Sequence, residues 1–251
     1  MRGFRWIAAS VAKLYGGVLY IRNVLYNKGH LKTHTARIKT IALGNLSLGG
    51  TGKTPHVEYL LELLKGRQPA VLSRGYGRRS RGTFVVDAET STADQAGDEP
   101  LQIAKKYPQV PVVCDGDRVR GLQFIEQEFP ETSIVILDDA LQHRRITAGL
   151  NLLLTPFDNP FTADHILPLG DLRDHPIRAW QADAFIVTKT PSHADQIGKR
   201  NIAEALKKYG KPIFFSTIRY GDVAQLGGRG GKTLPPGSVV VALTGIAKPM
   251  N

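Results

Sequence analysis

The sequence predicts an α/β fold in which a doubly wound, mostly parallel β-sheet follows an N-terminal amphipathic helix. Short, nearly continuous runs of Val, Ile and Leu alternate with helical or looped stretches, which is typical of parallel strands covered by helices on both faces. A glycine-rich loop joins the first of these runs to a helical stretch. The N-terminal helix is predicted by an apolar, basic segment with helical periodicity.

The first expected element is a helix over residues 4–25, where apolar residues recur at helical spacing. Lys13 interrupts the apolar run and Gly16 and Gly17 weaken its middle, so the run is too short for a transmembrane helix. No small-residue cleavage site follows, which argues against a removable signal peptide. Two interpretations stay open: an interfacial helix with its apolar face in lipid, or an amphipathic helix packed on its own domain. The apolar stripe consists of Phe4, Ile7, Val11, Leu14, Val18 and Ile21, widened by Ala8, Tyr15 and Leu25.

The later apolar runs are expected to be strands, and residues 53–65 are expected to form a helix that tolerates Pro55 in its first turn. Cys114 is the single cysteine, which excludes an internal disulfide and suits a reducing, cytosolic setting. Its apolar surroundings indicate a small core residue. The expected strands are residues 38–43, 70–73, 110–114, 133–137, 150–154, 184–188, 213–216 and 239–243.

The chain is expected to divide into an N-terminal helix (1–32), a nucleotide-binding core (33–225) and a Gly/Pro-rich connection with a last strand (226–251). A doubly wound domain seldom ends on a strand and its turn. A further C-terminal region is therefore expected beyond Asn251.

The positive charge is concentrated at the N-terminus. The formal net charge is +11, and nine Lys or Arg residues precede Glu58, the first acidic residue. A uniformly basic chain would indicate nucleic acid, whereas a basic excess on one apolar segment indicates an anionic membrane surface. We therefore expect a lipid surface as a partner and no nucleic acid.

The glycine-rich loop, residues 44–54, ends in Gly-Lys-Thr and is expected to bind the phosphates of a nucleoside triphosphate. Its glycines let backbone N–H groups turn toward phosphate oxygens, and the following helix adds the positive end of its dipole. Lys53 is expected to reach the β- and γ-phosphates, and the Thr54 hydroxyl is expected to bind Mg²⁺. Ser47 stands where the general pattern has a glycine. The expected fold is therefore P-loop NTPase-like, with Ser47, Leu48, Gly49, Gly50, Thr51, Gly52, Lys53 and Thr54 at the nucleotide.

A second metal anchor is expected at Asp138 and Asp139, which follow the apolar run 133–137. A carboxylate at the end of a neighbouring strand can hold Mg²⁺ directly or through water. Two adjacent carboxylates repel each other unless a cation lies between them.

The base-recognition signal favours ATP over GTP. Guanine-specific members of this fold have a lysine followed two residues later by an aspartate, whereas here Lys189 is followed at that position by Pro191.

Several motifs together resemble the tetraacyldisaccharide 4'-kinases, the lipid A kinases of Gram-negative envelope synthesis. The nucleotide loop carries the resemblance first, through Gly44-Asn45 and through Gly49 to Pro55. The other motifs follow in family order over nearly the whole chain, and include the early segments Leu14 to Gly16 and Arg22-Asn23. They are residues 72–78, 97–100, 117–118, 138–143, 169–173 and 243–247.

The resemblance implies transfer of the γ-phosphate of ATP, with Mg²⁺, to the 4'-hydroxyl of a tetraacyldisaccharide 1-phosphate. This lipid A precursor lies in the cytoplasmic face of the inner membrane, which implies a peripheral enzyme and an interfacial N-terminal helix. The resemblance implies two catalytic residues, Lys53 and Asp98, with Asp98 as the general base. From the residues alone, Asp98 would be a helix N-cap. The candidate substrate or phosphate contacts are Arg74, Arg78, Arg118, Gln142, His143 and Arg173.

The resemblance also implies a smaller C-terminal region, with a histidine that supports the catalytic aspartate. A protein that stopped at Asn251 would lack this region and is expected to transfer phosphate weakly. No obligate protein partner is expected.

Two other functions compete with this interpretation. A P-loop NTPase switch for metal delivery or partner assembly would need metal-ligand clusters or an intact guanine motif, and one cysteine with seven scattered histidines offers neither. A nucleic-acid-dependent ATPase, suggested by a pI of about 9.8, would need basic residues interleaved with aromatic ones across the domain.

Overall fold

The computed structural model describes residues 2–219, with side chains from Trp6 onward. The expected strand over residues 239–243 and the expected region 226–251 lie outside the described residues.

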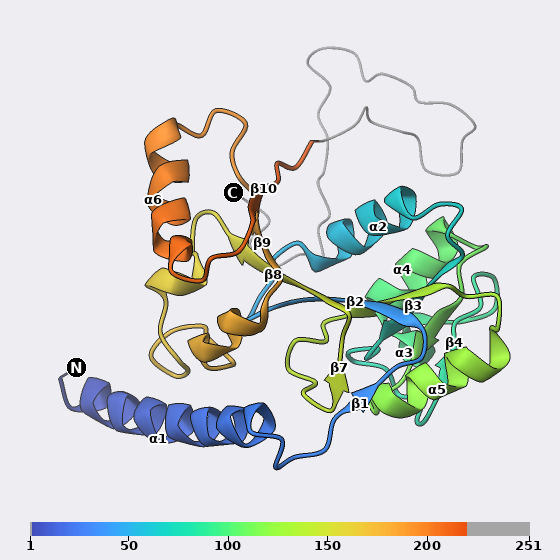
Figure 1. The fold of residues 1–251 in the computed structure, drawn as a ribbon, viewed down its shortest axis with the longest axis horizontal. Coiled ribbons are helices and arrows are strands. Elements are labelled where there is room, and N and C mark those ends of the chain that lie inside the picture. Colours follow the sequence, from blue (N-terminus) through green and yellow to red (C-terminus); the bar gives the residue numbers. More distant parts are fainter. Residues whose placement is uncertain (1, 220–251) are drawn as a thin grey trace.

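The described chain is built around one eight-stranded sheet, in which only β4 and β5 pair antiparallel (Figure 1). This arrangement confirms the predicted doubly wound, mostly parallel sheet. Seven expected strands are present, with ends shifted by at most two residues. In spatial order the strands are β10 (Ile213–Phe215), β9 (Ala184–Thr188), β8 (Leu150–Pro156), β2 (Lys39–Asn45), β6 (Ile134–Asp138), β3 (Pro69–Ser73), β5 (Val112–Cys114) and β4 (Phe84–Val85).

Three strands of two residues each were not predicted, because so short a segment shows no periodic pattern. One is β4 at the edge of the large sheet. The other two, β1 (His34–Thr35) and β7 (Ile146–Thr147), form a separate parallel pair. The structure thus adds edge elements without changing the predicted architecture.

Helices cover both faces of the sheet. On one face, α2 (Lys53–Leu63) and α4 (Asp98–Lys106) pack on alternate strand residues such as Ile41 and Ile136. On the other face, α5 (Arg118–Glu128) packs on the intervening residues, including Ala42. The remaining helices are α1 (Arg2–Asn27), α3 (Ala93–Ala96), α6 (Gln196–Lys207) and the 3₁₀ helices η1 (Phe161–Ala163) and η2 (Pro176–Gln181).

Cys114 lies in the core beneath α4, as predicted. Its side chain is buried in the same cluster as Ile136, and burial raises the pKa of its thiol to about 11. A thiol with so high a pKa is almost wholly protonated at neutral pH, so Cys114 is a packing residue.

The parallel order of the strands sets where functional residues can meet. The strands β2, β6 and β3 are neighbours and run in the same direction, so their carboxyl ends share one edge of the sheet. The glycine loop follows β2, Asp138 ends β6 and Asp139 follows it, and Arg74 follows β3. Open α/β sheets bind their ligands at this edge.

The N-terminal helix α1 packs on the core through a face other than its apolar stripe. Ala12, Gly16, Leu19 and Asn23 recur at helical spacing and are buried. Gly16 lets the helix approach closely, since an added Cβ would lie 3.0 Å from the side chain of Ile166. Asn23 is the polar anchor of this face.

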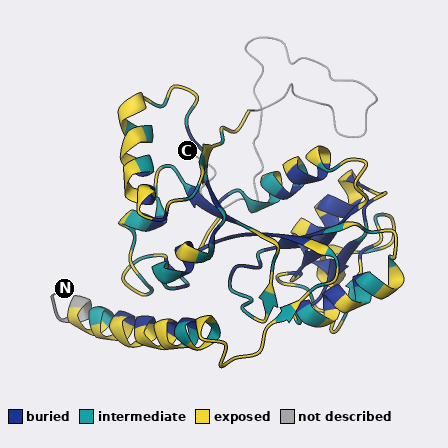
Figure 2. Cartoon of the chain, viewed as in Figure 1, coloured by how far each residue is buried: buried dark blue, intermediate teal, exposed yellow. Residues whose placement is uncertain are grey.

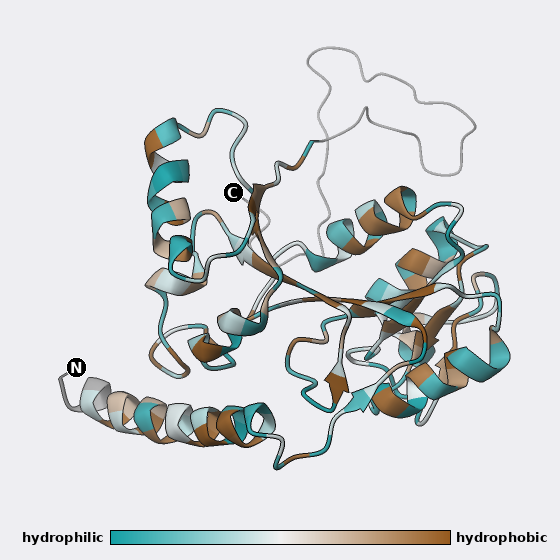
Figure 3. Ribbon diagram, viewed as in Figure 1, coloured by the Kyte–Doolittle hydropathy of each residue, from teal (hydrophilic) through white to brown (hydrophobic). Residues whose placement is uncertain are grey.

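The predicted apolar stripe of α1 faces away from the rest of the described chain (Figures 2 and 3). Leu14 is 73% exposed, and the other stripe residues with described side chains are exposed as well: Ile7, Val11, Val18 and Ile21. In the described residues, no helix combines the length and the apolar content needed to cross a membrane.

Candidate active site

The glycine loop connects β2 to α2 and has two halves with different backbone conformations. In the first half, Leu48 N–H donates to the Asp171 carbonyl (2.7 Å), and Arg173 N–H donates to the Leu46 carbonyl (2.8 Å). Ser47 forms an antiparallel bridge with Leu172 between these bonds. Because bridged backbone is extended, any residue suits position 47, which explains the serine where the general pattern has glycine.

The second half of the loop requires glycine. Gly49 (φ 94°) and Gly52 (φ 82°) have left-handed backbone conformations that other residues rarely adopt. Gly52 is also the N-cap of α2, with no side-chain cap. The backbone N–H groups at the start of α2 have no acceptor within the helix, and they lie beside the side chains of Lys53 and Thr54, as a phosphate site requires.

Lys53 lies in a charged network at the carboxyl ends of β2 and β6. Its Nζ is 3.5 Å from Asn45 Oδ1 and 3.7 Å from Asp139 Oδ1. Arg173 closes the network, because its guanidinium forms a bidentate contact with Asp139 and donates to Asn45 Oδ1 (2.6 Å). Burial alone would raise the pKa of Asp139, but Arg173 and Lys53 hold it below its ordinary value. Asp139 is thus an ionised partner of two cations.

Asp138 has different surroundings, although it is the next residue. It is 2% exposed, and its Oδ2 accepts a hydrogen bond from Ser73 Oγ (3.0 Å). Its Oδ1 is buried and has no hydrogen-bond partner among the described residues. Burial, and then the nearby Glu99 and Asp139 carboxylates, raise its pKa to about 6. A buried carboxylate with one free oxygen suits a cation ligand.

Asp98 is the first residue of α4 and is exposed. The expected N-cap role is wrong, since Gly97 takes the N-cap position. Gly97 packs against the loop after β3, where an added Cβ would lie 2.8 Å from the Tyr76 carbonyl. This contact holds Asp98 and Glu99 beside the loop that carries Arg74.

The predicted arginine contacts have very different surroundings. Arg74 is exposed and has no ion pair among the described residues. Arg78 donates to the backbone carbonyls of Cys114 (3.1 Å) and Gly82 (2.6 Å) and so braces its own loop. Arg79 pairs at the surface with Asp94.

Arg118 is 2% exposed, so its side chain supports the site from within the core and is not accessible to a substrate, contrary to the prediction. It donates to the carbonyls of Asp115 (2.6 Å) and Asp138 (3.3 Å). Burial lowers its pKa to about 10. From this position Arg118 fixes the backbone that carries Asp138.

Gln142 and His143 follow the paired aspartates. Gln142 Nε2 donates to the Asn45 carbonyl (2.6 Å), so the side chain supports the glycine loop. Burial, and then Arg118 and Arg74, lower the pKa of His143 to about 4, which leaves its imidazole neutral near pH 7.

Helix α1 reaches this site through two hydrogen bonds that the sequence did not predict. Tyr15 Oη donates to the Arg173 carbonyl (3.2 Å), and Arg22 donates to the Gln142 carbonyl (2.9 Å). Both acceptors belong to residues that hold the loop network. The exposed apolar stripe of α1 thus lies on a helix fastened to the candidate site.

His56, in the first turn of α2, was also not predicted. Its Nδ1 is 2.7 Å from the Gly52 carbonyl and its Nε2 is 3.0 Å from Ser216 Oγ. Burial lowers the pKa of His56. The contact joins the glycine loop to the end of β10. The two residues are 160 positions apart in the sequence, so no local pattern could predict the contact.

A cavity of about 200 Å³ lies beside the glycine loop. Gly49 and Thr51 line one side of it, and Pro156, Asp158 and Lys189 line the other, at the ends of β8 and β9. Thr188 Oγ1 donates to the Thr51 carbonyl (2.8 Å) and fixes that side of the loop.

Comparison with known proteins gives one consistent result. The family described as tetraacyldisaccharide-1-P 4'-kinase (LpxK) matches residues 4–251. Among the curated relatives, the tetraacyldisaccharide 4'-kinase of Cytophaga hutchinsonii is 44% identical over 239 residues, covering 94% of this chain and 67% of the relative. The tetraacyldisaccharide 4'-kinase of Flavobacterium psychrophilum is 42% identical over 246 residues, covering 95% of this chain and 71% of the relative. Further relatives are covered over as little as 57% of their length.

A solved structure shares the fold. The crystal structure of LpxK from Aquifex aeolicus, in complex with ATP, superimposes with a TM-score of 0.69 at 29% sequence identity. The match covers 88% of this chain and 84% of that one. By its sequence match, its fold and its relatives, the chain belongs to the tetraacyldisaccharide-1-P 4'-kinase family.

Proposed function

We propose that this chain forms the ATP-binding and phosphate-transferring part of a kinase that phosphorylates the 4'-hydroxyl of a tetraacyldisaccharide 1-phosphate, the lipid A precursor. The observation that carries the proposal is the meeting of Lys53, Asp138 and the Arg74 loop at one edge of the sheet. Family membership identifies the reaction class.

The phosphates of ATP would lie on the second half of the glycine loop. The backbone N–H groups of Gly50 to Thr54 would bind phosphate oxygens, and Lys53 would leave Asp139 to contact the β- and γ-phosphates. Asp139 and Arg173 hold the lysine near this position before nucleotide binds. Ser47 and Leu48, whose backbone pairs with residues 171–172, would support the loop from outside.

Magnesium fits the residues present. The Oδ1 of Asp138 is a buried acceptor to which no residue in the described range 2–219 donates, and a divalent cation held there with the Thr54 hydroxyl would satisfy it. Asp139 is already paired with two cations, so Asp138 is the preferred ligand. Bound Mg²⁺ supplies neutralisation of the charge on the transferred phosphoryl group.

Asp98 is the proposed general base. It is exposed at the start of α4, beside the loop of Arg74, so a substrate hydroxyl can approach it from solvent. Arg74, which forms no ion pair within the described part of the chain, is suited to a phosphate of either substrate. His143, neutral and close to Arg74, can hydrogen-bond a sugar hydroxyl without adding charge.

The lipid acceptor would reach the site along α1. The exposed apolar stripe of α1 would lie in the lipid of the inner membrane's cytoplasmic face, with the N-terminal cations near anionic headgroups. The hydrogen bonds of Tyr15 and Arg22 then hold the transfer site next to that surface. The protein would be peripheral on this membrane.

The test is ATP-dependent phosphorylation of tetraacyldisaccharide 1-phosphate in detergent micelles. It uses this chain and, in parallel, the full gene product. In the full product, Asp98→Asn should lower transfer about 10²–10⁴-fold, the usual range for a lost general base, and leave the Kd for ATP nearly unchanged. Asp94→Asn, an exposed acid in the neighbouring α3, is the matched control and should transfer normally.

A full product that binds ATP but phosphorylates no acceptor would disprove the kinase proposal. Loss of ATP binding in Asp98→Asn would instead assign Asp98 to the metal or to the fold.

A further inference from the structure

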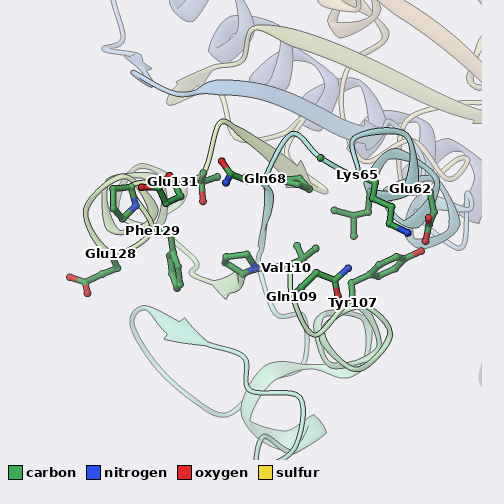
Figure 4. Close-up of a pocket in the computed structure, with 15 residues that line it drawn as sticks. Glu62, Lys65, Gln68, Tyr107, Gln109, Val110, Glu128, Phe129 and Glu131 are labelled. Carbon is green, nitrogen blue, oxygen red and sulfur yellow. The ribbon is translucent and has the colours of Figure 1, made fainter.

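A larger cavity, of about 460 Å³, lies at the edge of the sheet opposite the glycine loop (Figure 4). It is lined by residues at the carboxyl-terminal ends of α2, α4 and α5 and at the starts of β3 and β5, so we name it the three-helix cavity. None of its lining residues belongs to the candidate active site. Its volume is within the range of small-molecule sites.

The inner part of the three-helix cavity is apolar. Leu61, Tyr107 and Val110 are buried core residues that also line it. Figure 4 shows Tyr107 and Phe129 on opposite sides with Val110 between them. Two aromatic rings and an aliphatic floor suit an apolar body of moderate size.

The rim of the cavity is negatively charged. Glu62, Glu128 and Glu131 line it and are exposed, against a single cation, Lys65. Among the described residues, none of these four side chains forms an ion pair. Three helices also end here, and the carbonyl end of a helix carries partial negative charge. The whole chain is basic, so this local excess of negative charge runs against its overall charge.

We propose that the three-helix cavity binds a small organic cation, an ammonium group carried on an aromatic or aliphatic body. The body would lie on Leu61, Val110 and the ring of Phe129, and the ammonium would lie at the rim among the three carboxylates. Phe129 can add cation–π attraction, whereas the Tyr107 ring already has Lys106 Nζ over it, 5.7 Å from the ring centroid. The same rim repels phosphate and carboxylate ligands, which separates this site from the nucleotide site in ligand chemistry.

The probe is 4-phenylbutylamine, compared with 4-phenylbutan-1-ol and 4-phenylbutyrate, which keep the body and change only the charged end. Binding to the 251-residue chain is followed by calorimetry and by NMR chemical shifts, first without nucleotide and then with saturating ATP and Mg²⁺. We expect saturable amine binding with a Kd of about 0.1–5 mM, at least tenfold weaker binding of the alcohol, and none of the acid.

Two variants locate the binding. Glu62→Gln/Glu128→Gln/Glu131→Gln should raise the Kd of the amine at least tenfold and leave alcohol binding unchanged. Glu89→Gln/Glu204→Gln, which removes exposed carboxylates elsewhere, is the matched control and should bind the amine normally. Gln109→Trp places a large ring at the exposed rim and should block both ligands without lowering the melting temperature.

Equal binding of all three probes, absence of saturable amine binding, or displacement of the amine by ATP would each overturn the proposal. So would an unchanged amine Kd in the triple Glu variant. None of these outcomes bears on phosphate transfer, which the kinase assay tests separately.

Discussion

Asp138 and Asp139 are neighbours in the chain, yet their carboxylates have different partners. Asp139 is held by Lys53 and Arg173, whereas the buried Asp138 carboxylate accepts a hydrogen bond from one described side chain, the Ser73 hydroxyl. The strand ends at Asp138, and Asp139 has a left-handed backbone (φ 50°), so the two side chains diverge. A cation bound here would therefore contact only one of the two carboxylates.

The raised pKa of Asp138 makes a prediction about stability. Its pKa of about 6 in the folded chain lies above the ordinary value of 3.8, so ionisation opposes folding. This penalty is absent below pH 4, develops between pH 4 and 6, and is complete above pH 6. Asp138→Asn should therefore stabilise the nucleotide-free chain by about 1–3 kcal/mol at pH 7.5, and the gain should vanish near pH 4.

Urea denaturation at several pH values measures this gain, and calorimetry should show weaker Mg²⁺-dependent ATP binding by the same variant. The control is Asp115→Asn, since Asp115 is also buried but accepts from Arg120 and Thr83. Burial would raise the pKa of Asp115, but these bonds lower it, so its loss should destabilise the chain at pH 7.5. The same sign in both variants would contradict this account.

At the scale of elements, α1 has two faces with separate tasks. The small residues Ala12 and Gly16, with Leu19 and Asn23, fasten it to the core, and Asn23 Nδ2 donates to Asp174 Oδ1 (3.1 Å). The stripe with Leu14 and the other large apolar residues is left exposed. A helix that packs through a face rich in small residues and exposes most of its large apolar ones suits a second, apolar environment on its outer side.

Replacing part of this stripe should release the chain from lipid. Leu14→Gln/Val18→Gln removes two apolar side chains that contact no core, so vesicle binding should weaken at least tenfold while ATP binding and melting temperature stay unchanged. Sedimentation with vesicles that contain anionic lipid measures the effect. Ile197→Gln on α6, which is 69% exposed, is the matched control. Unchanged vesicle binding would make the stripe unrelated to lipid.

The most specific part of the fold could be predicted because its signals are local. A strand, the glycine loop and the helix that begins at Lys53 are consecutive, and the left-handed turns at Gly49 and Gly52 need glycine. The role of Ser47 could not be predicted, because its partner Leu172 is 125 positions later in the sequence. Local patterns identify the loop, but a distant segment determines which half of it is paired through its backbone.

At the scale of the whole molecule, the charge distribution bears on membrane binding. Nine of the cations precede the first acidic residue, and many lie on or just after α1. The proposed lipid contact therefore combines an apolar stripe with electrostatic attraction. The three-helix cavity, at the opposite edge of the sheet from the glycine loop, is the contrasting acidic surface.

Vesicle binding of the whole chain should depend on salt. Raising NaCl from about 0.1 M to about 1 M shortens the Debye length from about 10 Å to about 3 Å, so binding to anionic vesicles should fall at least about fivefold. Neutral phosphatidylcholine vesicles should bind weakly at both concentrations. Salt-independent binding would mean that the apolar stripe acts alone and that the N-terminal cations are not near the lipid.

The sequence by itself determined the α/β class, the nucleotide loop and the family resemblance, because periodicity and motif spacing are properties of short segments. Only the tertiary structure decided what each charged residue does. Arg118 is buried behind Asp138, and Arg173 reaches Asp139 across 34 residues and Asn45 across 128. These partners depend on how distant loops converge at the edge of a parallel sheet. The same holds for α1, whose apolar stripe was evident in the sequence but whose packed face depends on the surface it meets.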